Sequence, residues 1–168
     1  MTFFSIEKLT RQHAVDDFDC GEEALNRFLT RFAFPNQQAN ASQTYVGLAD
    51  SRVIGFYTLV VSEVSYEDAP DRLKKGLARQ PVPLMLLARL AVSKTMQRKG
   101  AGAGLLKDAI LRTLHAADIA GIRAIATHAK NEQARAFYEH FGFIASPTDP
   151  LHLFVLMKDL RQMLTSAK

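Results

Sequence analysis

Three glycines stand at alternate positions, 100, 102 and 104, directly after the adjacent cations Arg98 and Lys99. An apolar run at residues 84–92 precedes this string and apolar residues at helical spacing follow it, which predicts a turn from a strand into a helix. Such a turn directs backbone N–H groups toward one point, where the helix N-terminus adds partial positive charge. The residue types and their spacing therefore predict a binding site for a phosphate group.

Two common phosphate-binding motifs do not fit this string. The P-loop requires Gly-x-x-x-x-Gly-Lys-Ser/Thr, which the sequence does not contain. The dinucleotide-binding fingerprint requires a third glycine where Leu105 stands, and its acidic residue is also missing downstream. The pattern that does fit is Gln/Arg-x-x-Gly-x-Gly/Ala, which runs from Gln97 to Gly102.

This pattern resembles the pyrophosphate-binding loop of the GNAT superfamily of N-acetyltransferases. The surrounding order agrees, since LARLAV (87–92) precedes the loop and NEQARAFYEHFGF (131–143) follows it. The resemblance implies acetyl-CoA as acetyl donor and no metal, with the pantetheine arm bound along the strand and the pyrophosphate bound at the loop. The donor-binding residues that it implies are Leu90, Ala91, Val92, Gln97, Arg98, Lys99, Gly100, Ala101, Gly102 and Asn131.

The resemblance also implies a catalytic role for Tyr138, because an equivalent tyrosine of the family stands beside the cofactor sulfur. A phenol with a pKa of about 10 can protonate a departing thiolate whose thiol has a pKa of about 8.5. The implied mechanism is direct attack of a neutral amine on the thioester, with strand N–H groups polarising its carbonyl and no covalent enzyme intermediate. The general base stays open between Glu63, His128 and a chain of water molecules.

A closer likeness covers almost the entire chain. FDCGEEALNRFL (18–29), SQTYV (42–46), APDRLKKG (69–76) and LMLLARLAV (84–92) look like the toxin branch of the GNAT enzymes. The resemblance implies that the acceptor is the α-amino group of aminoacyl-tRNA, so that acetylation blocks translation. It further implies a ribbon-helix-helix antitoxin as partner, and a homodimer. Two positions depart from the branch: Gln43 stands where arginine is frequent, and Arg98 where many relatives carry glycine.

A basic surface for the tRNA backbone is compatible with the sequence, whose net charge is +4. The candidate substrate contacts are Arg27, Arg31, Arg72, Lys74, Lys75, Arg79 and Arg89. Spacing alone does not show that these cations share one face. Two other functions stay open: a housekeeping GNAT enzyme that acetylates a protein N-terminus or small amine, and a non-catalytic module that binds acetyl-CoA or RNA.

Length and composition indicate one domain over residues 1–168, with 48% hydrophobic and 23% charged residues as in ordinary globular proteins. Cys20 is the only cysteine, which excludes an internal disulfide and favours a reducing compartment, so we expect a cytoplasmic protein. No apolar stretch approaches the roughly 20 residues that span a bilayer, so we expect no membrane segment.

Periodicity predicts an α/β (mixed α+β) fold, a single GNAT-like domain in which helices flank a central, mixed, mostly antiparallel sheet. We expect a helix over 19–32, with Asp19 and Glu22 in its cap and an apolar stripe of Leu25, Phe28, Leu29 and Phe32. Asn131 is expected to cap a helix over 132–141 that ends at Gly142. The other expected elements are strands at 3–9, 43–49, 52–64, 84–92, 122–129 and 151–160, a polar break at 34–42, one helical turn within 65–83, and a helix from Gly104 to about Gly121.

Overall fold

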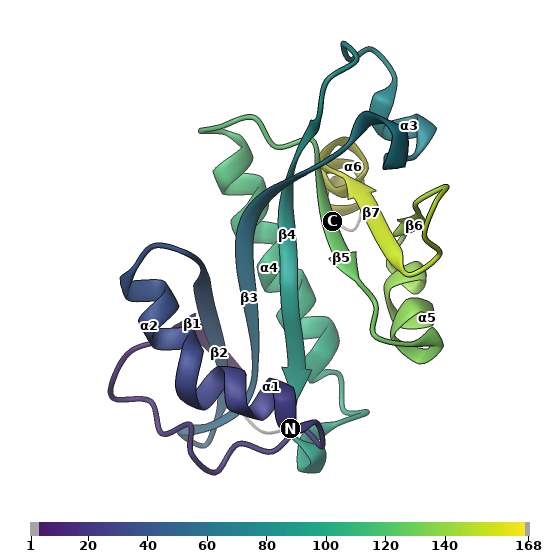
Figure 1. Cartoon of the computed structure of the whole chain (residues 1–168). Helices are drawn as coiled ribbons and strands as arrows, with labels where there is room; N and C mark the ends of the chain where they lie inside the picture. Colours follow the sequence, from purple (N-terminus) through teal and green to yellow (C-terminus); the bar gives the residue numbers. More distant parts are fainter. Residues whose placement is uncertain (1–3, 167–168) are drawn as a thin grey trace. The chain divides into compact units, whose positions relative to one another are not determined.

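The computed structural model describes residues 4–166, in which strands and helices follow one another much as the sequence predicts (Figure 1). The strands are β1 (Phe4–Lys8), β2 (Gln43–Ala49), β3 (Arg52–Val64), β4 (Val82–Val92), β5 (Ala124–His128), β6 (Ile144–Ala145) and β7 (His152–Leu156). The α-helices are α1 (Glu23–Arg27), α2 (Ala33–Gln38), α3 (Asp71–Lys74), α4 (Ala101–Ala117), α5 (Glu132–His140) and α6 (Met157–Ser166). Three further turns of helix are η1 (Phe28–Phe32), which is π-helical, and the 3₁₀ turns η2 (Tyr66–Asp68) and η3 (Lys94–Met96).

The strands form one seven-stranded mixed sheet with the order β1-β2-β3-β4-β5-β7-β6. The pairs β1–β2, β2–β3, β5–β7 and β6–β7 are antiparallel, whereas β4 and β5 run parallel. The predicted fold class, a mixed and mostly antiparallel sheet flanked by helices, is confirmed. The predicted hairpin of β2 and β3 is confirmed to the residue, and Asp50 and Ser51 join its strands with positive φ angles of 52° and 64°, as a type I′ turn requires.

The chain divides into two compact units, each with its own contacts. The first unit comprises Met1–Val60 and Leu87–Ala109, and the second comprises Val61–Leu86 and Ile110–Lys168. Strands β3 and β4 and helix α4 contribute residues to both units.

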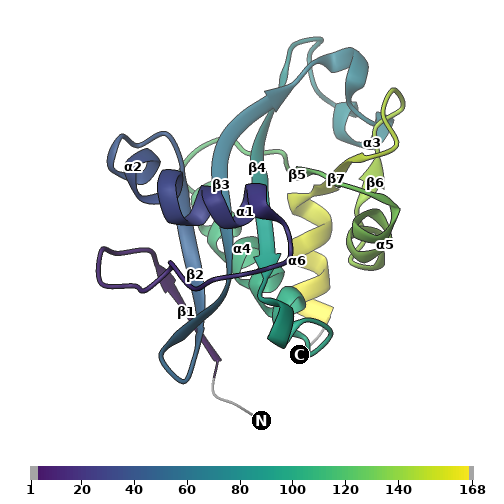
Figure 2. The ribbon, with the colours of Figure 1, turned by 60° about the horizontal axis from the view of Figure 1, so that its bottom comes forward.

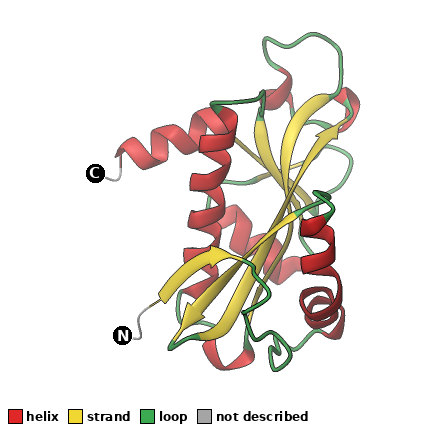
Figure 3. Ribbon diagram, turned by 90° about the vertical axis from the view of Figure 1, so that its left-hand side faces the viewer, coloured by secondary structure: helices red, strands yellow, loops and turns green. Residues whose placement is uncertain are grey.

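In the first unit, helices cover both faces of the strands (Figures 2 and 3). Phe28 and Leu29 pack with Val46, Phe56 and other apolar residues to form the core under α1, η1 and α2. On the opposite face, the Tyr57 hydroxyl donates a 2.6 Å hydrogen bond to Asp108 of α4. This division follows from strand alternation, because Phe56 and Tyr57 are neighbours that point to opposite faces of β3.

Glycine lets α4 approach this opposite face closely. A Cβ atom at Gly55 would lie 2.8 Å from Leu105 Cδ1 and 2.9 Å from the Ala91 carbonyl oxygen. Leu105 is fully buried at this point. The side chain that glycine lacks is therefore replaced by a leucine from α4, which fixes the helix that follows the glycine turn against the strands.

The first helical region differs from the prediction in its cap, its stripe and its end. Helix α1 begins at Glu23, and Asp19 instead accepts hydrogen bonds from the Gly21 N–H at 2.9 Å and the Asn26 amide at 3.0 Å. The predicted core residue Phe32 is 50% exposed. The expected polar break at 34–42 is also wrong in part, because α2 continues through Gln38.

The π-helical segment explains why the predicted stripe fails at Phe32. A π turn contains one residue more than an α turn, so it rotates the following side chains away from the regular helical period. Phe28 and Leu29 face the core before the shift, and Ala33 replaces Phe32 there after it.

The second unit has its own core, built by the C-terminal end of β3 and the N-terminal half of β4 together with β5 and β7. Its buried members include Leu73, Leu84, Ala126 and Phe154. Arg123 holds the turn at α3 by donating to the backbone oxygens of Leu73 at 3.1 Å and Lys75 at 2.9 Å. The single strand expected over 151–160 is wrong in its second half, because β7 ends at Leu156 and α6 begins at once, with Leu160 buried on its inner face.

Candidate active site

The glycine turn leads from the end of β4 through η3 into the longest helix, α4. The helix begins at Ala101, three residues before the predicted start at Gly104, so Gly102 lies within its first turn. Gly100 precedes the helix with a φ of +87°, and a Cβ at this residue would meet nothing within 4 Å. Gly100 is therefore required by the backbone conformation rather than by crowding. The first N–H groups of the 17-residue helix α4 follow directly, an arrangement that favours an anion.

The residues before Gly100 hold and charge the turn. The Gln97 side-chain amide donates to the backbone oxygens of Val92 at 2.9 Å and Cys20 at 3.0 Å, so both of its N–H bonds are engaged in fixing the turn. Arg98 and Lys99 are exposed, and Arg98 has a φ of +64°, a conformation that disfavours residues other than glycine. Arg98 is one of the two positions at which the sequence departs from the pattern that the resemblance implies, and it adopts a conformation that favours glycine.

Strand β4 provides the other predicted donor contacts. Ala91 is buried in the core of the first unit, and Leu90 and Val92 are half-buried beside it. The parallel pairing with β5 is described at Leu84, Met85 and Leu86, and β4 continues from there to Val92. The predicted binding strand thus extends six residues beyond its described pairing with β5.

Tyr138 lies in the second unit on α5, where the predicted cap is confirmed. The Asn131 side chain accepts a 2.9 Å hydrogen bond from the Ala134 N–H, and Gly142 ends the helix with a φ of +92°. Tyr138 is 6% exposed and its ring lies 5.2 Å from that of Phe137 and 5.3 Å from that of Phe143.

The phenol of Tyr138 is held in its neutral form. Burial raises the pKa of Tyr138 to about 12, and a hydrogen bond with the Thr127 side chain on β5 acts in the opposite direction. Thr127 is itself 3% exposed, so its hydroxyl is a fixed partner for the phenol. Sequence reasoning missed Thr127, since nothing in IRAIATHA distinguishes it from other core residues of a strand.

The candidate bases are both exposed residues of the second unit. Glu63 lies on β3 and His128 ends β5. The His128 ring stacks on that of His152 with 4.0 Å between centroids, and burial together with His128 lowers the pKa of His152. The candidate base His128 thus has a second imidazole, that of His152 on β7, stacked against it at the end of β5.

The predicted tRNA contacts form separate groups in the two units. In the first unit, Arg89 of β4 lies over the ring of Phe28 at 3.7 Å. Phe28 directly follows Arg27 in the chain and stands three residues before Arg31, and both of these arginines are exposed. Desolvation lowers the pKa of Arg89.

In the second unit, Lys74 and Arg79 lie over the Tyr66 ring at 4.8 Å and 5.7 Å, and Arg79 also pairs with Glu67 at 3.2 Å. Lys75 is exposed nearby in sequence, whereas Arg72 pairs with Asp159 at 2.9 Å.

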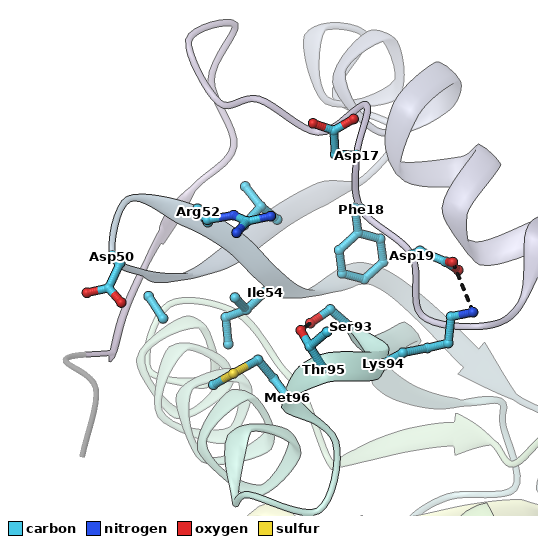
Figure 4. A pocket seen from close by; sticks show the side chains of 12 residues that line it. Asp17, Phe18, Asp19, Asp50, Arg52, Ile54, Ser93, Lys94, Thr95 and Met96 are labelled. Carbon is cyan, nitrogen blue, oxygen red and sulfur yellow. Dashed lines mark hydrogen bonds and ion pairs between the residues drawn. The ribbon is translucent and has the colours of Figure 1, made fainter.

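A pocket of about 330 Å³ opens in the first unit beside the β2–β3 turn and η3 (Figure 4). Carboxylates and cations share its rim, where Lys94 pairs with Asp19 at 3.2 Å, and Phe18, Ile54 and Met96 contribute apolar surface. Its η3 wall ends immediately before Gln97. No local sequence pattern marks this pocket, because its lining comes from three segments that lie far apart in the chain.

Residues 4–166 contain no group of three or more His, Cys, Asp or Glu side chains placed to hold a metal ion. Within the same range, none of the helices combines the length and the apolar character needed to cross a bilayer.

A mixed sheet that delivers a glycine turn to a long helix, followed by a buried and neutral tyrosine on α5, is the arrangement of an acyl-CoA-dependent acetyltransferase. The chain belongs to the acetyltransferase (GNAT) domain family, whose model matches residues 40–145. It is 47% identical over 150 residues to the "tRNA-acetylating toxin" of Mycobacterium tuberculosis (strain ATCC 25618 / H37Rv), covering 89% of this chain and 90% of that protein. The predicted family and enzyme class are confirmed.

Two solved structures extend the comparison. The toxin AtaT complexed with acetyl-methionyl-tRNAfMet has a TM-score of 0.89 and 30% identity, covering 96% of this chain and 99% of that one. A tyrosine-to-phenylalanine mutant of AtaT bound to acetyl-CoA and to the C-terminus of the antitoxin AtaR has a TM-score of 0.82 and 30% identity, covering 97% and 99%. The toxin branch identified from the sequence is therefore confirmed by close structural similarity.

Proposed function

We propose that this protein is a toxin that transfers the acetyl group of acetyl-CoA to the α-amino group of aminoacyl-tRNA and thereby blocks translation. The observation that carries the proposal is the 47% identity to a tRNA-acetylating toxin over 89% of the chain. The buried, neutral phenol of Tyr138 supports it, because this reaction needs a proton donor for the departing thiolate.

The donor site consists of the turn and the end of β4. The backbone N–H groups at Gly100, Ala101 and Gly102 bind the pyrophosphate, with Arg98 and Lys99 adding positive charge and Gln97 holding the turn in place. Leu90, Ala91 and Val92 supply backbone groups to the amides of the pantetheine arm, as an added strand would pair. Asn131 uses its side-chain oxygen in the helix cap, so only its amide N–H bonds are available to the donor.

Catalysis proceeds by direct attack of the neutral amine nitrogen on the thioester carbonyl carbon. The C–N bond forms, the C–S bond breaks with its electron pair going to sulfur, and the nitrogen releases one proton to water while the sulfur gains one proton, which leaves an amide and the free thiol of CoA. The proposal requires the Tyr138 hydroxyl to reach that sulfur. The proposal also requires the Thr127 hydroxyl to donate to the phenol oxygen, the direction that lowers the phenol pKa, so that the O–H bond of Tyr138 can point at the thiolate.

The high pKa of Tyr138 restricts how this proton moves. The pKa of about 12 exceeds that of a free thiol, about 8.5, by a margin equivalent to roughly 5 kcal/mol. Full proton transfer to a solvated thiolate is therefore uphill. Tyr138 stabilises the developing thiolate first as a hydrogen-bond donor, and transfer becomes favourable only while the sulfur is itself desolvated in the site.

The cellular setting follows from the same proposal. Residues 1–168 act as one catalytic domain in the cytoplasm, where charged tRNA is found, and the protein works as a homodimer. A ribbon-helix-helix antitoxin silences it, in keeping with the antitoxin AtaR that is bound to the related toxin AtaT. A basic protein with a net charge of +4 suits both an RNA substrate and an acidic antitoxin segment.

The test is transfer of labelled acetyl groups to a pool of charged tRNA, followed by mass spectrometry of the aminoacyl group. Wild-type protein should label it, Tyr138→Phe should be slower by about 100-fold or more, as is typical for loss of an acid catalyst, and Tyr45→Phe should behave as wild type. Tyr45 is the matched control because its ring can still stack on Tyr57 at 5.1 Å when its hydroxyl is removed.

Other outcomes discriminate the alternatives. Acetyl-CoA binding with transfer only to a protein N-terminus or a small amine would replace the tRNA acceptor by that of a housekeeping enzyme. Binding without transfer to any amine would leave a non-catalytic module. Full activity of a folded Tyr138→Phe protein would remove the tyrosine from the mechanism.

A further inference from the structure

Arg89 is partly buried and has no carboxylate partner among the described residues. Other arginines, such as Arg72, Arg79, Arg135 and Arg161, pair with carboxylates. Among residues 4–166, no carboxylate forms an ion pair with Arg89, although its side chain is partly buried at the lower part of β4. A partly desolvated cation without a counter-charge is unfavourable on its own, so this position is suited to an anion from outside the chain.

The geometry around Arg89 favours a flat, anionic ligand. One face of its guanidinium lies on the Phe28 ring at 3.7 Å, which fixes the plane of the group and leaves its N–H edges and its second face for a ligand. The N–H edges match phosphate oxygens in a bidentate arrangement, and the second face can stack on a nucleobase. Lysine could provide the charge but neither of these contacts.

Two further arginines stand in the helical region that carries Phe28. Arg27 and Arg31 belong to the segment that carries Phe28, both are exposed, and neither has an ion-pair partner among the described residues. The helical region that carries Phe28 thus has two exposed arginines without an ion-pair partner among the described residues, whereas Arg135 and Arg161 are each paired with a carboxylate. This contrast within one protein is the pattern expected of a phosphate-binding surface.

We propose that Arg89, stacked on Phe28, binds the phosphodiester next to the terminal nucleoside of the aminoacyl-tRNA, so that the enzyme recognises the nucleotide that carries the amino acid. This inference rests on the proposed function. In aminoacyl-tRNA the amino acid that carries the amine is esterified to the terminal ribose. The last phosphodiester is attached to the 5′ oxygen of the same ribose. An arginine on the strand that binds the donor is therefore placed to hold the acceptor by its phosphate while the amine is presented to the thioester.

The experiment combines enzyme variants with truncated acceptors. Wild type, Arg89→Ala, Arg89→Lys and Phe28→Leu are compared on charged tRNA, on an aminoacyl-adenosine carrying a 5′-phosphate, and on the same aminoacyl-adenosine without it. Arg161→Ala is the matched control, because it removes an arginine that pairs with Asp118 in the second unit. Acetyl-CoA binding and circular dichroism of every variant report on the donor site and the fold.

Arg89→Ala should lower kcat/KM about 10- to 100-fold on the two acceptors that carry the phosphate, as expected for a charged hydrogen bond. On the acceptor without phosphate its effect should stay below about two-fold, and acetyl-CoA binding should be unchanged. Arg89→Lys and Phe28→Leu should give intermediate losses, with the same dependence on the phosphate, because each keeps the charge but loses the fixed plane.

Equal losses on acceptors with and without phosphate would overturn the inference, as would no loss on any of them. If the wild type acetylates none of the three acceptors, the proposed function itself fails. Binding of the uncharged trinucleotide CCA then decides about Arg89 separately: a weaker affinity for Arg89→Ala supports the phosphate contact, and an unchanged affinity refutes it.

Discussion

The protonation of Tyr138 links the stability of the protein to pH in a way that Tyr138→Phe should abolish. The folded-state pKa of about 12 is raised above the value of 10.0 for an unperturbed tyrosine. Because the neutral phenol is favoured in the folded state, the stabilising effect is fully present below pH 10 and is lost as the pH rises toward 12. The predicted free-energy difference between the two ends of this window is roughly 3 kcal/mol.

The measurement is urea unfolding of wild type and Tyr138→Phe at a series of pH values between 8 and 11.5. Other groups titrate over the same range, but they are present in both proteins, so the difference between the two isolates Tyr138. Relative to the phenylalanine variant, the wild type should lose about 1.4 kcal/mol of unfolding free energy between pH 8 and pH 11. Parallel pH profiles would refute the reasoning, since they would mean that the phenol titrates alike in the folded and unfolded chain.

The same pKa predicts the pH dependence of the reaction. Tyr138 should stay protonated throughout the range in which the amine becomes neutral, so kcat on a fixed acceptor should rise with pH and show no decline below about pH 10 that belongs to this tyrosine. A descending limb near pH 9 that disappears in Tyr138→Phe would show that the bound donor, or a neighbouring charge, lowers the phenol pKa.

Substitutions at three further positions test the local structure. Gly55→Ala should destabilise the protein by about 1–3 kcal/mol in urea unfolding, because the new Cβ would lie 2.8 Å from Leu105 Cδ1 and 2.9 Å from the Ala91 oxygen; an unchanged midpoint would disprove the close approach. Gly100→Ala should lower the free energy of unfolding by about 1–2 kcal/mol and weaken the binding of acetyl-CoA. Gly100→Asn should lower it by less, because asparagine tolerates positive φ better. Equal losses for the two variants in calorimetry would instead indicate a steric requirement for glycine. Asn131→Ala should lower stability by about 1 kcal/mol and Asn131→Asp should not, because aspartate keeps the oxygen that accepts from the helix; an equal loss in both would point to a role for the amide N–H bonds.

Sequence reasoning succeeded where one local signal determines the structure. The β2–β3 hairpin follows from alternating apolar residues around Asp50 and Ser51, and the cap of α5 follows from Asn131. The glycine turn was located because its pattern requires a positive φ, which Gly100 adopts. Each of these features depends on residues that are close together in the chain.

The features that were missed depend on contacts between distant residues. The contact of Thr127 with Tyr138 depends on the packing of β5 against α5, and the contact of Arg89 with Phe28 depends on the packing of β4 against η1. The engagement of Gln97 with Cys20 spans 77 positions and turned an expected phosphate donor into a support for the turn. Residue types reveal which groups can do chemistry, but packing decides which of them are already occupied.

The π-helical segment joins these observations at the site of the further inference. A regular α-helix through residues 23–38 would keep Phe28 and Phe32 on the same stripe, one turn apart, and both would be drawn into the core. The extra residue of the π turn exposes Phe32 while Phe28 keeps its place between the core ring of Phe56, at 6.2 Å, and the guanidinium of Arg89. π turns are rare and are found frequently at functional sites, which agrees with the place of this one beside Phe28 and Arg89. The π-helical segment, which the sequence did not predict, thus carries the ring on which Arg89 stacks, and this stacking leaves the N–H edges of Arg89 for a phosphate.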